Sequence, residues 1–238
     1  MKETLVLIPG TLCDVSLFDH QRANISDLVH CQAVDCSRCD DLKDMAALIL
    51  SEITGNFSLL GFSYGGIIAF EMMRQAPQRI TKLILLNTNH KAPSEATVAS
   101  QKKYLKMVET GDFRKITTDF TKESMLHPTH AKRLEIREKV LRMALNVGEA
   151  GFVNQVKAQL NRPDSTGDLP KINCPTLIIT GREDRICPPA LHQEMAELIP
   201  NAQLKIIEEC GHLSTLEQPE IVNETIRKWW LNVKGNNA

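Results

Sequence analysis

The chain alternates short apolar runs with longer segments in which apolar residues recur every three or four positions. The short runs are rich in isoleucine, leucine and valine, as expected of strands that are buried on both faces. They predict strands at residues 4–9, 31–36, 57–62, 81–87, 175–180 and 203–208. The longer segments predict helices at residues 16–29, 42–54, 64–76, 189–199 and 219–233. Because this alternation is typical of an α/β fold, we expect a mostly or all-parallel sheet of about six strands flanked by helices.

One interval departs from this alternation. Residues 90–162 contain no convincing strand, and two stretches within them, 96–113 and 131–160, have the spacing of amphipathic helices. We therefore expect residues 1–89 and 163–238 to form an α/β core, with residues 90–162 inserted between the fourth and fifth strands as a helical cap, or lid. Apolar residues of this interval either pack against one another or line a pocket. The candidates are Met107, Phe113, Phe120, Met125, Met143 and Phe152.

Composition narrows the classes of protein that fit this pattern. With 238 residues and 42% hydrophobic content, the chain is large enough to bury a sizeable core. The formal net charge of -1 favours neither a nucleic-acid partner nor a basic membrane-binding surface. No apolar run reaches the ~18 residues that a membrane span needs. The N-terminal apolar run ends at Pro9-Gly10, too early for a signal peptide, so we expect a cytoplasmic protein.

The cysteines predict neither disulfides nor a metal site. Their number is odd and they are scattered along a long chain, which is not the pattern of a disulfide framework. Cys36 and Cys39 form a CxxC pair, but no second pair of ligands follows at a spacing suited to zinc. We expect structural or surface thiols, and neither a metal nor an organic cofactor.

The segment Gly61-Phe62-Ser63-Tyr64-Gly65 matches the pattern G-x-S-x-G between a predicted strand and a predicted helix. In a turn of this kind glycines flank the serine because a Cβ atom would clash with the neighbouring backbone. The turn exposes the serine hydroxyl at the carboxyl edge of the sheet. The alternative is an ordinary glycine-rich turn with an inert serine, so the interpretation depends on what else reaches that edge.

Two further strands deliver the groups that would activate a serine. His212 follows the sixth predicted strand and is the candidate base, since a serine hydroxyl is a poor nucleophile until a base takes its proton. Asp184, or alternatively Glu183, follows the fifth strand and would orient the imidazole. Ser63, Asp184 and His212 thus follow three separate strands at one sheet edge, which favours a catalytic interpretation over three unrelated loop residues.

Two backbone amides are candidates for binding an oxyanion. Tyr64 follows the serine directly at the start of a helix, where N–H groups and the positive end of the helix dipole point outward. The second amide is expected from the turn after the first strand, where Gly10 permits a sharp bend. Thr11 is the candidate there and Leu12 the alternative.

These motifs together resemble the α/β-hydrolase superfamily, and the resemblance covers nearly the whole chain. The segments that show the resemblance are "PGTLCD" (9–14), "GFSYGG" (61–66), "GREDRICPP" (181–189) and "CGHLSTLEQPE" (210–220). The chain is most similar to the capped branch that includes 3-oxoadipate enol-lactonases, small carboxylesterases and cofactor-free haloperoxidase-like enzymes. Many relatives have His-Gly where this chain has Pro9-Gly10, and most have an antiparallel hairpin before that strand. We therefore expect an all-parallel sheet here.

The favoured hypothesis is a serine hydrolase that cleaves a small or medium carboxylic ester or lactone through an acyl-enzyme, with a small-molecule acyl substrate as its partner. Ser63 would be the nucleophile, with His212 as base and Asp184 as its orienting group. The same triad would equally serve a thioesterase, a C–C hydrolase or a perhydrolase. A non-catalytic ligand receptor on the same fold is the alternative of a different class.

Overall fold

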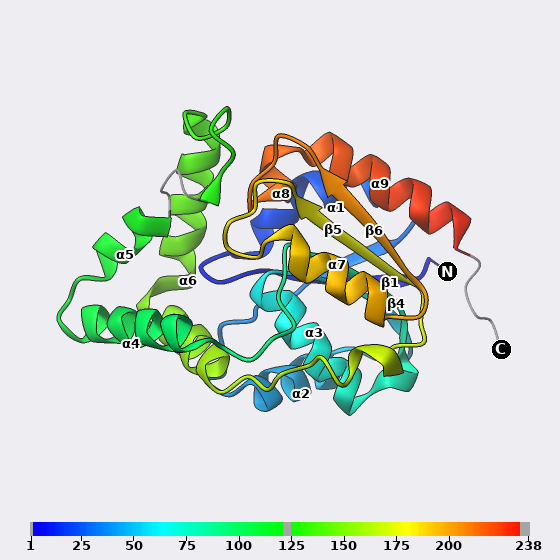
Figure 1. Ribbon diagram of the computed structural model, residues 1–238, viewed down its shortest axis with the longest axis horizontal. Helices are drawn as coiled ribbons and strands as arrows, with labels where there is room; N and C mark the ends of the chain where they lie inside the picture. The colour runs from blue at the N-terminus through cyan, green and yellow to red at the C-terminus, as the bar shows by residue number, and fades with distance from the viewer. Residues whose placement is uncertain (1, 121–124, 234–238) are drawn as a thin grey trace.

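The computed structural model describes residues 2–120 and 125–233. Its centre is a six-stranded, all-parallel sheet in the order β2-β1-β3-β4-β5-β6 (Figure 1). The strands are β1 (Thr4–Ile8), β2 (His30–Ala33), β3 (Phe57–Phe62), β4 (Ile80–Leu86), β5 (Thr176–Gly181) and β6 (Ala202–Ile207). The predicted α/β fold with an all-parallel sheet is therefore confirmed.

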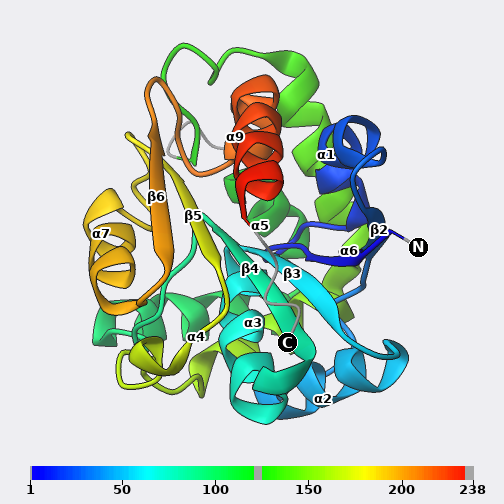
Figure 2. The same ribbon diagram turned by 90° about the vertical axis from the view of Figure 1, so that its right-hand side faces the viewer.

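Helices cover both faces of this sheet (Figures 1 and 2). One face carries α1 (Asp19–Ile25) and α9 (Pro219–Asn232), whose apolar residues share a core cluster that includes Ile25 and Trp229. The helices that pack on the other face are α2 (Leu42–Glu52), α3 (Tyr64–Gln75) and α7 (Pro189–Leu198). Alternate side chains of each central strand enter the two clusters, since successive residues of a strand point to opposite faces. In β3, for example, Leu59 packs in one cluster and Leu60 in the other.

Outside residues 90–162, most predicted elements agree with the observed bounds to within two residues, and two differ by more. The second strand was expected over residues 31–36 but ends at Ala33, because β2 lies at the edge of the described sheet and its partner there, β1, ends at Ile8. The helix expected over residues 16–29 is a 3₁₀ turn (Val15–Phe18) followed by the short α1. Asp14 begins that turn, since its side chain accepts a hydrogen bond from the Ser16 amide.

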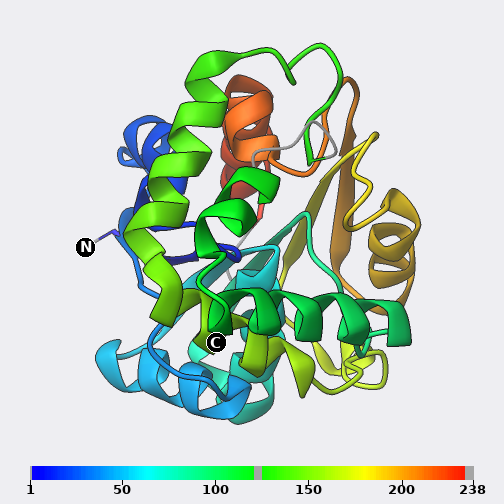
Figure 3. The same cartoon turned by 90° about the vertical axis from the view of Figure 1, so that its left-hand side faces the viewer.

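Between β4 and β5 the described part of the chain forms helices and loops and no strand. The helices are α4 (Glu95–Glu109), α5 (Phe113–Phe120) and α6 (Leu134–Leu160), of which α5 was not predicted separately. They lie together at one side of the sheet (Figures 1 and 3) and share a third apolar cluster that includes Phe152. Gly148, with φ 70°, interrupts the helical backbone of α6. Residues 121–124 of the expected cap lie outside the described residues, and the division into core and cap stays a prediction.

The site lies at the carboxyl edge of the sheet, where the loops after β1, β3, β4, β5 and β6 meet. A short helix, α8 (Ser214–Glu217), follows the last of these loops. Across the described ranges, no helix combines the length and the apolar character needed to cross a bilayer.

Candidate active site

Ser63 sits between β3 and α3 in the backbone conformation that the glycine pattern predicts. Its φ of 51° and ψ of -115° place it in a region that residues with a side chain rarely adopt. A Cβ atom on Gly61 would lie 2.5 Å from the carbonyl oxygen of Gly65, and one on Gly65 would overlap the carbonyl oxygen of Ile8. Glycine at both positions therefore lets α3 start directly against β1 and β3.

Hydrogen bonds from the neighbouring strand hold this turn. The Ser63 amide donates to the carbonyl oxygen of Leu86 over 2.9 Å, and the Ser63 carbonyl oxygen accepts from the Thr88 hydroxyl over 2.7 Å. The amide of Gly66 donates to the same carbonyl oxygen over 2.9 Å. The backbone around the serine is thus fixed from β4, from the loop after it and from α3, while the hydroxyl contacts His212.

The structure brings together the three side chains that the sequence singled out. His212, in the loop after β6, has its Nε2 atom 3.0 Å from the Ser63 hydroxyl oxygen. Its Nδ1 atom lies 2.9 and 3.0 Å from the two carboxylate oxygens of Asp184. The amide of His212 donates to the carbonyl oxygen of Met125 over 2.8 Å, which ties the histidine loop to the segment before α6.

Asp184, and not the alternative Glu183, faces the histidine. Glu183 instead accepts a hydrogen bond from the Cys210 amide over 2.9 Å. The Asp184 carboxylate is buried and accepts from the amides of Ile186 and Cys187 over 2.9 and 2.8 Å. Burial acts to raise the pKa of Asp184, but the charge of His212 and the hydrogen bonds that the carboxylate accepts outweigh it, so the pKa lies below its ordinary value. This carboxylate is therefore ionised at neutral pH.

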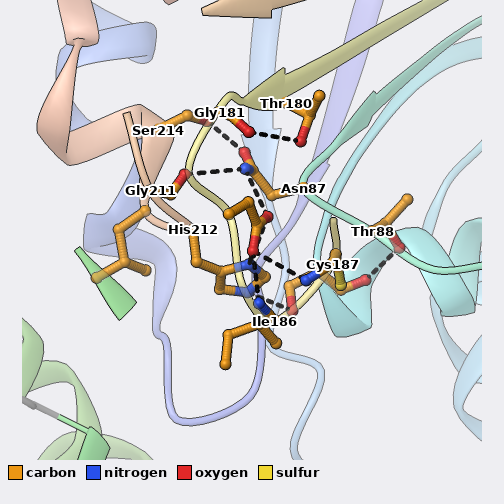
Figure 4. A network of polar contacts seen from close by, with 12 residues as sticks. Asn87, Thr88, Thr180, Gly181, Ile186, Cys187, Gly211, His212 and Ser214 are labelled. Carbon is orange, nitrogen blue, oxygen red and sulfur yellow. Dashed lines mark hydrogen bonds and ion pairs between the residues drawn. The ribbon is translucent and has the colours of Figure 1, made fainter. Parts of the chain in front are cut away.

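Asn87 is a site residue that the sequence reasoning missed. It follows β4, has a φ of 46°, and donates from its side-chain amide to the Asp184 carboxylate over 3.0 Å and to the Gly211 carbonyl oxygen over 3.3 Å. Its side-chain oxygen accepts from the Ser214 hydroxyl. Figure 4 shows the Asn87 side chain between Gly211, Ser214 and the ring of His212. The signal was present in the sequence, since Asn87 is the polar residue that ends the predicted strand 81–87 at the same sheet edge.

The turn after β1 distinguishes the two candidates for the second oxyanion amide. The Leu12 amide donates to the side-chain oxygen of Gln155, a buried residue of α6, over 2.9 Å. The Thr11 amide has no acceptor among the described residues, while the Thr11 hydroxyl accepts from Gln159 over 3.0 Å. Tyr64 is the first residue of α3, so its amide has no acceptor within the helix. Sequence reasoning did not anticipate the two glutamines, because they lie far along the chain from the turn.

A cavity of about 510 Å³ opens over the serine. Its walls include Ser63, His212 and Thr11 together with residues of α4 and α6. Of the apolar candidates between residues 90 and 162, two line this cavity: Met125 and Phe152. Three others pack in the apolar clusters: Met107, Phe113 and Met143. The side chain of Phe120 lies outside the described residues.

In the described structure the cysteines are free thiols, and the acidic side chains do not gather into a metal-binding cluster. All seven cysteines are unpaired, and burial raises the pKa of Cys13, which lines the cavity, to about 12. That thiol is therefore protonated at neutral pH and is a poor nucleophile. The described residues contain no cluster of three or more histidine, cysteine, aspartate or glutamate side chains arranged to hold a metal ion.

Comparison with known proteins agrees with this architecture. Residues 37–219 match the family model described as the alpha/beta hydrolase fold. A putative non-heme bromoperoxidase, BpoC, of Mycobacterium tuberculosis is 29% identical over 207 residues, which cover 80% of this chain and 74% of the relative. A pimeloyl-[acyl-carrier protein] methyl ester esterase of Nitrosomonas europaea is 26% identical over 208 residues, which cover 80% and 77% of the two chains.

Solved structures show the same likeness. A thermophilic esterase from Thermogutta terrifontis, determined with malate bound, superposes with a TM-score of 0.85 at 28% identity and covers 96% of this chain and 89% of its own. An enol-lactonase from Burkholderia xenovorans LB400 superposes with a TM-score of 0.86 over 98% of this chain and 92% of its own; at 16% identity it supports the fold alone. Because the family model spans well over half of the sequence, the chain belongs to the α/β-hydrolase fold family.

Proposed function

We propose that this protein is a serine hydrolase that cleaves a small or medium carboxylic ester or lactone through an acyl-enzyme intermediate. The observation that carries the proposal is the continuous row of hydrogen bonds from the Ser63 hydroxyl through the His212 imidazole to the Asp184 carboxylate. The row ends at the wall of a cavity large enough for a small organic substrate.

In the first half of the reaction the Ser63 oxygen attacks the substrate carbonyl carbon. His212 accepts the hydroxyl proton at Nε2, and the Asp184 carboxylate stabilises the imidazolium and holds it in the tautomer that leaves Nε2 able to accept. The tetrahedral intermediate collapses when the imidazolium returns that proton to the leaving alkoxide. The alcohol departs and the acyl group stays on Ser63; with a lactone, the alcohol remains attached to the acyl group.

In the second half a water molecule takes the place of the alcohol. His212 removes one proton from the water as its oxygen attacks the acyl carbon, and the same proton returns to the Ser63 oxygen as the ester bond breaks. The products are the acid and the regenerated serine. Every proton transfer in this scheme uses the chain's own groups.

The amides of Tyr64 and Thr11 bind the oxyanion of each tetrahedral intermediate. Two features support Thr11 over Leu12: the Leu12 amide already donates to Gln155, and the Thr11 amide has no acceptor among the described residues. Preorganised amides of this kind lower the barrier because they are already oriented when negative charge develops.

The names of similar proteins support hydrolysis and leave several substrate classes open. Two of them, quoted above, are esterases, and a 2-hydroxymuconate semialdehyde hydrolase of Pseudomonas putida is 26% identical over 172 residues. The names of that relative and of the putative bromoperoxidase do not mention an ester. The substrate test therefore also includes thioesters, substrates with a cleavable C–C bond and peracid formation. Absence of turnover on all of them is the outcome expected of a receptor.

The test replaces the proposed nucleophile. We expect Ser63→Ala to lose both labelling by a fluorophosphonate and hydrolysis of p-nitrophenyl esters, with turnover reduced by about three orders of magnitude or more. Ser51→Ala, an exposed serine on α2, is the matched control and keeps both. Ester hydrolysis by Ser63→Ala at the wild-type rate would overturn the proposal. Labelling of the wild type without turnover of esters, lactones or thioesters would favour the receptor.

A further inference from the structure

Arg162 is a buried cation in the wall of the cavity that contains Ser63. It lies in the loop directly after α6, and only 7% of the residue is exposed. Arginine is among the residues that are almost never fully buried unless they are paired. The acceptors that its N–H groups find therefore indicate what the residue does.

The protein uses only part of this guanidinium group. Its Nε atom donates to the carbonyl oxygen of Lys91 over 3.0 Å, and its Nη1 atom donates to the carbonyl oxygen of Gln159 over 3.3 Å. A guanidinium has five N–H donors in a fixed fork, so three remain without an acceptor among the described residues. The two bonds to backbone oxygens fix the plane of the fork and leave the Nη1 and Nη2 end available.

The described residues supply Arg162 with no carboxylate partner. Burial lowers the pKa of Arg162, the direction expected when a cation loses water and no acidic side chain offsets the loss. The nearby Cys187 thiol does not neutralise the charge, because burial raises its pKa well above the ordinary value. Glu194 is engaged by Lys91. Asp119 also lines the cavity, but it makes a polar or electrostatic interaction of its own.

Burying an unpaired charge is costly, and a purely structural role would be filled by any donor to the two backbone oxygens. The planar fork of arginine matches the geometry of a carboxylate, to which two parallel hydrogen bonds can form. A carboxylate entering the cavity would neutralise the charge of Arg162 and accept hydrogen bonds from its free N–H groups. A second cation, Arg185, lines the same cavity from the loop after β5, is exposed, and forms no ion pair with any described residue.

We propose that Arg162 binds a carboxylate of the substrate, distinct from the carbonyl that Ser63 attacks, so that the preferred substrates are esters or lactones that carry an additional carboxylate group. The proposal rests on the proposed hydrolase function for its kinetic test. Arg162 acts by holding the substrate, and Arg185 adds to the positive potential that attracts an anion to the cavity.

The kinetic test compares two substrates that differ at the far end of the acyl chain only. Mono-p-nitrophenyl adipate carries a carboxylate where p-nitrophenyl hexanoate carries a methyl group. We expect the wild type to have the higher kcat/KM on the adipate ester. Because charge-assisted hydrogen bonds are strong, we expect Arg162→Gln to reduce the adipate-to-hexanoate ratio by about 10-fold to 100-fold, mainly through KM for adipate.

Two further variants separate recognition from charge alone. Arg162→Lys keeps the charge without the fork, and we expect it to recover only part of the ratio. Arg182→Gln removes an exposed arginine from the loop after β5, which also carries Arg185. Arg182 pairs with Glu208 and does not line the cavity. We expect this control to keep the wild-type ratio. The ratio is measured within each variant, so partial loss of folded protein does not change it.

A binding measurement decides the proposal even if no ester is hydrolysed. We expect free adipate to bind Ser63→Ala in calorimetry, and the added Arg162→Gln change to weaken that binding by about 10-fold or more. A wild type that prefers hexanoate, an Arg162→Gln variant that loses both substrates equally, or adipate binding that is unchanged by Arg162→Gln would overturn the carboxylate site. If the wild type hydrolyses neither ester but adipate binding still depends on Arg162, the result would count against the hydrolase proposal and not against the carboxylate site.

Discussion

At the scale of single residues, the site combines a strained backbone with closely matched polar partners. A residue with a side chain held at the φ and ψ of Ser63 costs about 1–3 kcal/mol. The hydrogen bonds from Thr88, Gly66 and the amide of Ser63 itself offset this cost. The strain is thereby confined to one residue, and its effect is to point the hydroxyl away from the backbone and toward His212.

Asn87 offers a test of how the carboxylate is supported. Glycine adopts a φ of 46° without strain, so Asn87→Gly removes the side-chain amide and keeps the backbone conformation. A hydrogen bond to a charged acceptor contributes about 1.5–3 kcal/mol, and we expect Asn87→Gly to lower the free energy of unfolding by about 2 kcal/mol near neutral pH. Urea denaturation measures the change. Asn201→Gly, at an exposed turn before β6, controls for the greater freedom of glycine in the unfolded chain.

The pH dependence of this effect has a definite sign. The folded pKa of Asp184 lies below its ordinary value of 3.8, so its ionised form stabilises the fold above pH 3.8 and that contribution is lost as the pH falls through the folded pKa. Removing the Asn87 donor raises the folded pKa toward 3.8. The destabilisation by Asn87→Gly is therefore largest near neutral pH and shrinks at about pH 3. An equal effect at both pH values would contradict this account of the carboxylate.

At the scale of elements, the serine turn depends on how closely α3 approaches two strands. The Cβ position of Gly65 is occupied by the backbone of Ile8 and Pro9 in β1 and the turn after it. Backbone atoms cannot move aside as the end of a flexible side chain can. Contact between the backbone at Gly65 and the backbone of Ile8 and Pro9 therefore fixes where α3 begins. It also fixes the position of the Tyr64 amide.

We expect Gly65→Ala to separate α3 from β1 and to lower the free energy of unfolding by about 3 kcal/mol or more, since overpacking against rigid atoms is costly. The same substitution at Gly167, where the added Cβ meets no heavy atom within 4 Å, is the matched control and changes stability little. Urea denaturation and fluorophosphonate labelling of Ser63 report the two consequences. Full labelling of a stably folded Gly65→Ala protein would show that the close approach is not needed.

The elements were predictable from sequence to the extent that local pattern determines them. The apolar run and glycines around Ser63 specify a strand, a turn and a helix within one short segment, and the structure has all three. Asp184 and Glu183 are adjacent, so only the three-dimensional path of the loop after β5 decides which carboxylate reaches His212. Gln155 lies far from Leu12 in the chain, and no periodicity indicates that its side chain reaches the turn after β1.

At the scale of the whole molecule, the central strands of the sheet and the helix α4 differ in how deeply they are buried. Every residue of β3 is buried, whereas α4 buries one residue, Val108, among its 15. Local opening needs less free energy where fewer apolar contacts are broken. We therefore expect amides of α4 to exchange with deuterium faster than those of β3 and β4. Hydrogen-exchange mass spectrometry measures this difference, and equal protection of α4 and β3 would argue against a separate cap.

Sequence pattern also has a limit at this scale. Helical spacing indicated that residues 90–162 lack strands, but it did not show which of their side chains turn toward Ser63. Arg162 illustrates the point, because a lone arginine after a helix has no distinctive pattern. Its burial becomes visible only when the end of α6 is placed beside Lys91 in the loop after β4.

The two chain segments that connect the helices α4 to α6 with the sheet lie against each other. The amide of Ser165 donates to the carbonyl oxygen of His90 over 2.8 Å, and Arg162 bonds to Lys91 next to it. A long insertion whose ends already meet adds little closure entropy to the fold, since that cost grows only slowly with length. We expect helices of other length and sequence to be tolerated at this junction without rebuilding the sheet, provided that the contacts of Gln155 and Gln159 with the turn after β1 are kept. We therefore expect the cavity walls supplied by α4 and α6 to be transplantable, whereas Ser63 is fixed in place by β3 and α3.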